Sequence, residues 1–325
     1  MLEVKNLKVN FTTPRGILQA VRGVSFNLKE GEFLGIVGES GSGKSVTAAS
    51  IMNLIPHNGL ITGEVLMNGK RPLTMSGQEL LSFRGPETAM IFQEPGRSFD
   101  PIYNIKNTFF ETFKAHDPAM TETDSEIRTI NLLKEVHLPQ PEDRLKNFPH
   151  QFSGGQLQRI MIALALASSP KLLIADEPTT ALDVTIQAEI VELLKELKKS
   201  RKLAVIFITH DIELVSRLAD QIIVMYSGLI MEINSAQNII NNPYHPYTRG
   251  LLDSLPGFGN HYSTHKLVSI PGTVPDPVFP VQGCPFAPRC SMVKKDCYES
   301  LPELDRIDGT YRCIIEGPKG DISSG

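Results

Sequence analysis

Two short stretches of this sequence combine the residue types that bind and cleave phosphate compounds. The first fits the pattern G-x-x-x-x-G-K-[ST] and reads Gly38-Glu39-Ser40-Gly41-Ser42-Gly43-Lys44-Ser45. Its glycines allow backbone N–H groups to turn inward around phosphate oxygens, which a Cβ atom would hinder. Lys44 would bring a positive charge to the β- and γ-phosphates, and Ser45 a hydroxyl ligand for Mg²⁺. The stretch therefore predicts a phosphate-binding loop.

The second stretch ends an apolar segment in two adjacent carboxylates, Asp176 and Glu177. Two neighbouring carboxylates at the end of a buried strand are costly unless a cation or a reaction uses them. We expect a metal ligand and a general base at this point. A surface cluster of ion pairs is the alternative.

Three further sites are weaker candidates for contact with a phosphate compound. A small residue and two glycines open a predicted helix at Ser153-Gly154-Gly155-Gln156, the form of a second anion site, but this tetrapeptide alone is weak. His210 lies between a predicted strand and a helix, where a single histidine is usually structural. Gln93, which ends an apolar stretch, has no signal of its own.

Short apolar strands alternate with helices around these motifs, which predicts a mostly parallel α/β sheet. We expect strands over 32–37, 90–93, 171–175 and 203–209, and helices from 44 to about 54, 156–168 and 184–200. Residues 2–9 and 20–28 alternate as in a half-exposed antiparallel sheet. Residues 98–149 are helical and polar, most clearly over 126–136, and indicate an insertion.

The helix predicted over 184–200 has a clear apolar stripe. Asp183 precedes it as a plausible N-cap, and Lys198 and Lys199 suit the negative end of its dipole. The stripe consists of Ile186, Ile190, Leu193, Leu194 and Leu197.

Composition restricts the class of protein. The chain has 325 residues, of which 41% are hydrophobic, and a formal net charge of -4. This suffices for one large core with an appended small domain, and no basic field argues for nucleic acid. The longest apolar stretch, near 160–167, is far shorter than the roughly 20 residues of a membrane-spanning helix. No secretory signal is visible, so we expect a cytoplasmic protein, soluble or peripheral.

Composition shifts after about Ser235, where Asn, Pro and Gly become frequent, and we place a domain boundary there. All four cysteines follow, at Cys284, Cys290, Cys297 and Cys313, in the spacing C-x5-C-x6-C-x15-C. Such clustering favours a metal over disulfides. The paired C-x2-C knuckles of zinc ribbons are absent. Four thiolates on loop-rich backbone suit an iron–sulfur cluster, while zinc and no metal remain open.

Four stretches, taken in chain order, resemble motifs of the ATP-binding subunits of ABC transporters. They are Gly38–Ser45, Ser153–Gln156, Leu172–Glu177 and Thr209–Asp211. Three stretches after Ser235 resemble the oligopeptide/dipeptide importer subfamily: Tyr244-His245-Pro246-Tyr247-Thr248, Ile270-Pro271-Gly272 and Gly283-Cys284-Pro285-Phe286-Ala287-Pro288-Arg289-Cys290. The resemblance implies an α/β P-loop NTPase (RecA-like) nucleotide-binding domain over residues 1–235. It also implies an antiparallel β subdomain, a helical subdomain at about 98–160, and a small irregular Cys-rich domain over 236–325.

The resemblance also implies roles for single residues in ATP hydrolysis. Asp176 would hold Mg²⁺ through water, and Glu177 would act as general base. Gln93 would sense Mg²⁺ and the attacking water, and His210 would contact the γ-phosphate. Ser153, Gly154, Gly155 and Gln156 would close over ATP bound by a second subunit.

Two assignments have equally plain structural alternatives. Asp183 would belong to the loop that joins two active sites, or serve only as the helix N-cap. Phe11 would stack on adenine, or be an ordinary core residue.

The implied cofactors are ATP, Mg²⁺ and a structural [4Fe–4S] cluster on the four cysteines. The implied partners are a paralogous ATP-binding subunit or a second copy, head to tail, two membrane permease subunits and, indirectly, an extracytoplasmic solute-binding protein. Such a protein would lie peripherally at the cytoplasmic face of the membrane and power peptide import. The alternatives are an ABC ATPase of DNA repair or ribosomes, which tends to have coiled coils or two ATP modules, and a tail that senses redox state or iron.

Overall fold

The computed structural model describes residues 1–180, 182–255, 269–304 and 310–315. The chain forms two compact units. Unit 1 comprises Met1–Leu28, Phe33–Leu73 and Thr209–Gly325, and unit 2 comprises Lys29–Glu32 and Thr74–Ile208. None of the helices in these described ranges is both long and apolar enough to cross a membrane.

Unit 1 contains an antiparallel sheet in the order β2–β1–β4. Its strands are β1 (Leu2–Thr13), β2 (Gly16–Leu28) and β4 (Gly59–Met67). Buried and exposed residues alternate along much of β1 and β2, which confirms the predicted half-exposed sheet. Both strands are longer than predicted because their pairing continues to the hairpin turn between Thr13 and Gly16. The pattern analysis missed β4.

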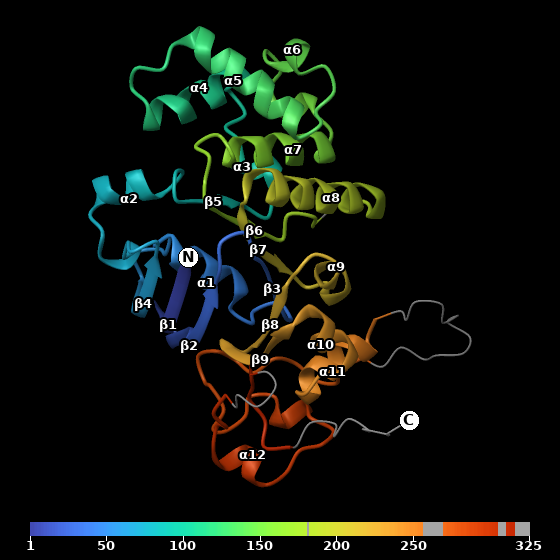
Figure 1. The fold of residues 1–325 in the computed structure, drawn as a ribbon. Coiled ribbons are helices and arrows are strands. Elements are labelled where there is room, and N and C mark those ends of the chain that lie inside the picture. Colours follow the sequence, from blue (N-terminus) through green and yellow to red (C-terminus); the bar gives the residue numbers. More distant parts are fainter. Residues whose placement is uncertain (181, 256–268, 305–309, 316–325) are drawn as a thin grey trace. The chain divides into compact units, whose positions relative to one another are not determined.

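A second set of strands in unit 1 has the order β10–β9–β8–β3 (Figure 1). It consists of β3 (Phe33–Val37), β8 (Gln221–Tyr226), β9 (Leu229–Ser235) and β10 (Thr310–Tyr311). Strands β3 and β8 are parallel, whereas β9 is antiparallel to both β8 and β10. The helices of this unit are α1 (Lys44–Ile51), α9 (Ile212–Ser216), α10 (Ala236–Asn241), α11 (Pro246–Asp253) and α12 (Asp296–Glu299).

Unit 2 is built on three parallel strands in the order β7–β6–β5. They are β5 (Thr88–Ile91), β6 (Leu172–Asp176) and β7 (Ala204–Thr209). The helices are α2 (Gly77–Phe83), α3 (Pro95–Ser98), α4 (Ile105–His116), α5 (Glu122–Glu135), α6 (Pro141–Arg144), α7 (Gly154–Ala165) and α8 (Val184–Arg201). Figure 1 shows α4 beside α5, and α5 packs on α7. The predicted helical insertion is thus confirmed.

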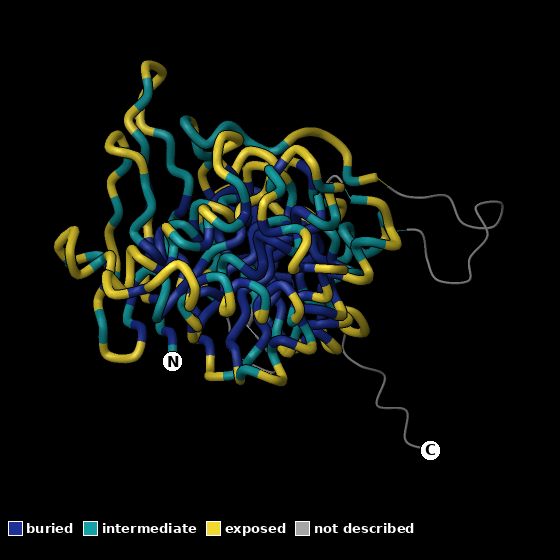
Figure 2. The backbone as a smooth tube through the Cα atoms, turned by 90° about the horizontal axis from the view of Figure 1, so that it is seen from above, coloured by how far each residue is buried: buried dark blue, intermediate teal, exposed yellow. Residues whose placement is uncertain are grey.

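The strands that lead to the motifs are the most deeply buried parts of the chain. Every residue of β3, β6 and β7 is buried, as parallel strands with both faces covered require (Figure 2). In α8, Ile190, Leu193, Leu194 and Leu197 are buried as predicted. Ile186 is only half-buried and Val191 takes its place in the stripe. These strands therefore fix the positions of the loops that follow them.

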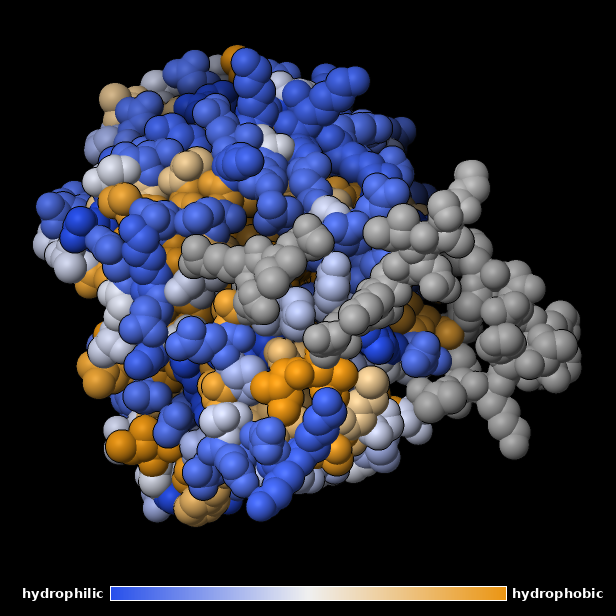
Figure 3. All heavy atoms as spheres, turned by 60° about the horizontal axis from the view of Figure 1, so that its bottom comes forward, coloured by the Kyte–Doolittle hydropathy of each residue, from blue (hydrophilic) through white to orange (hydrophobic). Residues whose placement is uncertain are grey.

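The described residues of the C-terminal segment, 236–255, 269–304 and 310–315, have little regular structure. They contain three short helices, the short strand β10 and the 3₁₀ turn Ala287–Arg289. Some of the segment's large apolar side chains are exposed, and Figure 3 shows hydrophobic side chains among hydrophilic ones on the face brought forward there. The exposed residues are Ile240, Phe279, Met292, Val293, Tyr298 and Ile314. The segment belongs to the same compact unit as β1–β4.

Candidate functional site

The glycine-rich stretch is a loop between β3 and α1, which confirms the predicted strand–loop–helix. Gly38 has φ +151°, and a Cβ there would lie 2.2 Å from the carbonyl oxygen of Met225. Gly43 has φ +98°, and a Cβ there would lie 2.5 Å from the carbonyl oxygen of Ala20. Only glycine meets both demands, a left-handed backbone and a close approach to neighbouring backbone.

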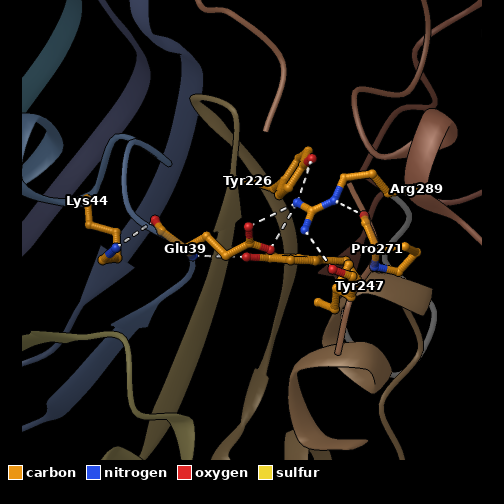
Figure 4. Close-up of polar contacts among 7 residues, drawn as sticks. Glu39, Lys44, Tyr226, Tyr247, Pro271 and Arg289 are labelled. Carbon is orange, nitrogen blue, oxygen red and sulfur yellow. Dashed lines mark hydrogen bonds and ion pairs between the residues drawn. The ribbon is translucent and has the colours of Figure 1, made fainter. Parts of the chain in front are cut away.

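The Lys44 ammonium lies over the loop that contains it (Figure 4). Its Nζ donates hydrogen bonds to the carbonyl oxygens of Gly38 at 2.8 Å and Glu39 at 3.0 Å. The residue is 5% exposed, so its charge is held at the loop rather than in solvent. Ser45 follows as the second residue of α1 and is exposed, as is Ser40 within the loop. A positive charge and a hydroxyl are thus present where the motif predicts them.

Two other predicted residues of unit 1 are in place but have no ligand against which to test them. Phe11 lies opposite Gly59 in the β1–β4 register and is half-buried, with its ring over the Gly59 backbone. His210 lies exposed between β7 and α9, and Asp211 caps that helix. Adenine stacking by Phe11 and γ-phosphate contact by His210 stay predictions.

In unit 2, strand β6 ends in the predicted pair of carboxylates. Asp176 is its last residue and is 7% exposed. Glu177 follows with φ +46°, a left-handed conformation unusual for a side chain of this size, and its N–H donates to the carbonyl oxygen of Ile208 at 2.9 Å. Such backbone outliers concentrate at functional sites.

The Glu177 carboxylate is held by two side chains. Its Oε2 accepts hydrogen bonds from Gln93 Nε2 at 3.2 Å and from Thr180 Oγ1 at 2.8 Å. The structure therefore brings together Gln93 and Glu177, which are distant in sequence. Thr180 was missed, and no motif or period in the sequence marks it.

The predicted second anion site opens helix α7. Ser153 caps the helix by accepting from the N–H of Gln156 at 3.3 Å, while the Gln156 side chain accepts from the N–H of Ser153 at 3.2 Å. Ser153 and Gly154 are exposed. A Cβ on Gly155 would lie 2.8 Å from Ile186 Cγ2, so this glycine lets α7 pack close to α8.

Asp183 caps α8, as predicted, by accepting from the N–H of Ile186 at 3.0 Å. Its side chain is exposed, which also leaves it accessible to a partner. Ala181, two residues before Asp183, lies outside the described residues.

The four cysteines are free thiols gathered in the C-terminal segment. The Cys284 N–H donates to the Cys297 carbonyl oxygen at 2.7 Å, and Gly283, at φ +73°, lies against the same carbonyl. Backbone N–H groups donate to the sulfurs of Cys297 and Cys313 at 3.4 Å.

Burial, together with the proximity of Cys313 and Cys297, raises the pKa of the Cys284 thiol to about 11. The pKa values of Cys290 and Cys313 are raised in the same way. The thiols are therefore near one another. In the described ranges, however, no three His, Cys, Asp or Glu side chains are grouped as around one metal ion.

Comparison with known proteins gives matches along nearly the whole chain. A family model described as "ABC transporter" matches residues 21–180, and one described as "Oligopeptide/dipeptide transporter, C-terminal region" matches 231–297. The oligopeptide transport ATP-binding protein OppD of Bacillus subtilis is 46% identical over 96% of this chain and 87% of its own length. The dipeptide transport ATP-binding protein DppD of the same organism is 47% identical over 99% and 96%.

Solved structures agree. The dimeric ATP-binding cassette MJ0796, in a post-hydrolysis state with ADP and phosphate, aligns with a TM-score of 0.65 and 31% identity. The match covers 73% of this chain and 99% of that one. The structure of cbiO1 from Clostridium perfringens aligns with a TM-score of 0.61 and 28% identity over 73% of this chain and 89% of that one.

Proposed function

We propose, from the premise that the chain belongs to the ABC transporter family as an ATP-hydrolysing subunit, that it powers peptide import across a membrane. Two kinds of match support a peptide substrate. The relatives that match nearly all of it are named oligopeptide or dipeptide transport proteins, and the C-terminal match is to a region of such transporters. The same matches favour transport over DNA repair or ribosome function.

The arrangement around Glu177 carries the proposed chemistry. A carboxylate can accept a proton from water as it attacks phosphorus, provided that the carboxylate is held in place. Glu177 is held by Gln93 and Thr180 and by its own left-handed backbone. We therefore assign Glu177 as the general base and Gln93 as the residue that orients it and the water.

Nucleotide would bind to unit 1 through the loop Gly38–Ser45. Lys44 would pair with the β- and γ-phosphates, His210 would contact the γ-phosphate, and Phe11 would stack on adenine. Mg²⁺ prefers oxygen ligands, and Ser45, Gln93 and Asp176 supply a hydroxyl, an amide and a carboxylate. When bound, Mg²⁺ would neutralise charge on the phosphates.

A second ATP-binding subunit would complete the site. Ser153 and Gly154 expose the N-terminus of the twelve-residue helix α7, where backbone N–H groups favour a phosphate. Because Asp183 is also exposed, we propose head-to-tail pairing with a paralogous subunit or a second copy. The matched cassette is itself dimeric. The proposed importer also contains two permease subunits and works with a solute-binding protein. The chain would lie peripherally at the cytoplasmic face of the membrane.

We propose that the chain divides near Ser235, with the ATP-binding domain over 1–235 and a C-terminal domain over 236–325. The C-terminal domain would hold a [4Fe–4S] cluster on Cys284, Cys290, Cys297 and Cys313. Each thiolate of such a cluster binds a different iron, so the sulfurs stand farther apart than around one ion. The absence of paired C-x2-C knuckles and the loop-rich backbone that carries Cys284, Cys290 and Cys297 support this choice over zinc.

Uptake of labelled peptides tests the transport function. Cells that lack this chain should lose uptake of di- or oligopeptides. The wild-type chain should restore uptake, and Lys44→Ala should not. Lys195→Ala, a change at a half-buried residue of α8 paired with Glu192, serves as the matched control. Unchanged peptide uptake in cells without the chain would refute the proposal.

The cluster has its own test. The anaerobically purified protein should absorb broadly near about 400 nm through sulfur-to-iron charge transfer, with iron and sulfide in roughly equal amounts and about four irons per chain. Zinc, or no metal in well-folded protein, would refute the cluster assignment and leave the ATPase assignment unchanged.

A further inference from the structure

An arginine of the C-terminal segment forms an ion pair with the phosphate-binding loop (Figure 4). Arg289 Nη1 donates to the carboxylate of Glu39, at 2.9 Å to Oε2 and 3.1 Å to Oε1. The side chains are 6% and 28% exposed, respectively. This pair is therefore largely shielded from solvent, unlike the exposed ion pairs that contribute little to stability.

The guanidinium of Arg289 is fixed on its other sides. Its Nε donates to the Pro271 carbonyl oxygen at 2.7 Å, and Nη2 donates to that of Ile270 at 3.4 Å. Nη1 also donates to the Tyr226 hydroxyl oxygen at 3.1 Å. Gly272 follows Pro271 with φ +77°, as a Pro-Gly turn requires. Two stretches that identify the C-terminal region therefore meet at Arg289.

A second contact holds the backbone of the same loop residue. The Glu39 N–H donates to the hydroxyl oxygen of Tyr247 at 2.9 Å. Tyr247 is fully buried, and its ring packs on Tyr226 and Phe286 with centroid distances of 4.7 and 5.2 Å. Tyr247 of the C-terminal segment therefore packs against β8 and the phosphate-binding loop.

Glu39 also contacts the loop lysine, because its carbonyl oxygen accepts from Lys44 Nζ at 3.0 Å. The side chain, the amide and the carbonyl of one loop residue are thus all engaged. The C-terminal segment holds the first two, and Lys44 holds the third. A shift of Arg289 or Tyr247 would therefore move the carbonyl on which Lys44 rests.

Charge gives the ion pair a second effect. Glu39 places a carboxylate in a loop proposed to surround a polyphosphate, and two negative charges within a few ångströms repel by about 1 kcal/mol or more. Arg289 neutralises this carboxylate through Nη1 alone. The Nε and Nη2 arms of its planar fork donate to the Pro271 and Ile270 carbonyls, an arrangement that a lysine does not reproduce.

We propose that Arg289 is a positioning residue for ATP binding, which acts through Glu39 rather than by touching the nucleotide. The inference rests on the proposed role of the Gly38–Ser45 loop. It assigns to the C-terminal segment a part in setting ATP affinity.

Steady-state ATPase kinetics of the full chain test the proposal, beginning with the wild type. Arg289→Ala should raise KM for ATP about tenfold, equivalent to about 1.4 kcal/mol, with kcat within about twofold of wild type. Arg289→Lys should raise KM less, by about threefold, since it keeps the charge and loses the fork. Arg249→Ala is the matched control, because Arg249 lies in the same segment and, among the described residues, its hydrogen bonds go to Pro243, Tyr244 and Met292 rather than to the loop.

The double variant Glu39→Gln with Arg289→Ala should recover KM to within about threefold of wild type, since no uncompensated carboxylate remains. Unchanged KM in folded Arg289→Ala, or an equal rise in Arg249→Ala, would overturn the proposal. A matching fall in kcat would indicate general destabilisation and would overturn it too. If Arg289→Ala does not fold, Arg289→Lys and Glu39→Gln decide, and unchanged KM in Arg289→Lys refutes the proposal. A wild type that does not bind ATP would instead refute the nucleotide site itself.

Discussion

The phosphate-binding loop and the C-terminal segment are held in place in opposite ways. In the loop, Lys44 bonds to carbonyls five and six residues away, and the glycines adopt conformations that other residues avoid. In the C-terminal segment, the contacts that reach the loop join Glu39 to Arg289 and to Tyr247, which are 250 and 208 positions away. The chemistry of this protein is thus encoded locally, whereas its positioning depends on long-range contacts.

The local half of this comparison predicts the largest effect. Lys44→Ala removes the charge that would pair with the phosphates, at a cost of about 2.7 kcal/mol, so ATP affinity should fall about 100-fold. Equilibrium titration with a fluorescent ATP analogue measures it, with Lys195→Ala as the control. Wild-type affinity in Lys44→Ala would show that the loop does not bind the phosphates.

A pair of glycines in the loop separates backbone conformation from close packing. Gly38 and Gly41 both have positive φ, but a Cβ on Gly38 meets the Met225 carbonyl oxygen at 2.2 Å, while one on Gly41 meets nothing within 4 Å. Gly38→Ala should lower the free energy of unfolding by about 3 kcal/mol and Gly41→Ala by about 1 kcal/mol. Urea unfolding compares them, and equal losses would show that the Met225 contact is unimportant.

The long-range half predicts a dependence of stability on pH. Burial lowers the pKa of His245 from 6.5 to about 3, so folding favours the neutral imidazole. This contribution is fully present above pH 6.5 and is lost as the pH falls toward 3. At pH 5.5 it should cost about 1.4 kcal/mol relative to pH 7.5.

His245→Asn isolates that effect. Asparagine can still cap α11 in place of Nδ1, which accepts from the Tyr247 N–H at 3.0 Å, but it does not titrate. The variant should therefore lose less stability than wild type between pH 7.5 and 5.5 in urea unfolding. Identical losses would locate the pH dependence elsewhere.

Sequence patterns predicted the parts of the fold that short periods encode. The strand before the glycine loop, the carboxylate pair at the end of β6 and the Asp183 cap all follow from neighbouring residues. Strand β4 was missed because its alternation is interrupted at Thr62 and Gly63, which are both exposed.

The residues that hold the site could not be predicted in the same way. Thr180 lies near Glu177, but its hydrogen bond depends on the left-handed backbone at Glu177. Arg289 reaches Glu39 only because Pro271 and Tyr226 orient its guanidinium. Neither relation has a period or a motif. The roles of Phe11 and His210 stay predictions, since they require a nucleotide.

ATP turnover by Glu177→Gln tests the central claim most directly. Glutamine keeps the shape of the side chain and one oxygen for Gln93 and Thr180, but it cannot act as a base. Turnover should fall about 100-fold or more while ATP affinity stays near that of wild type. Glu192→Gln, a change at an exposed carboxylate in the same unit, should leave both unchanged. Ordinary ATPase activity in Glu177→Gln would contradict the assignment of the base and the mechanism built on it.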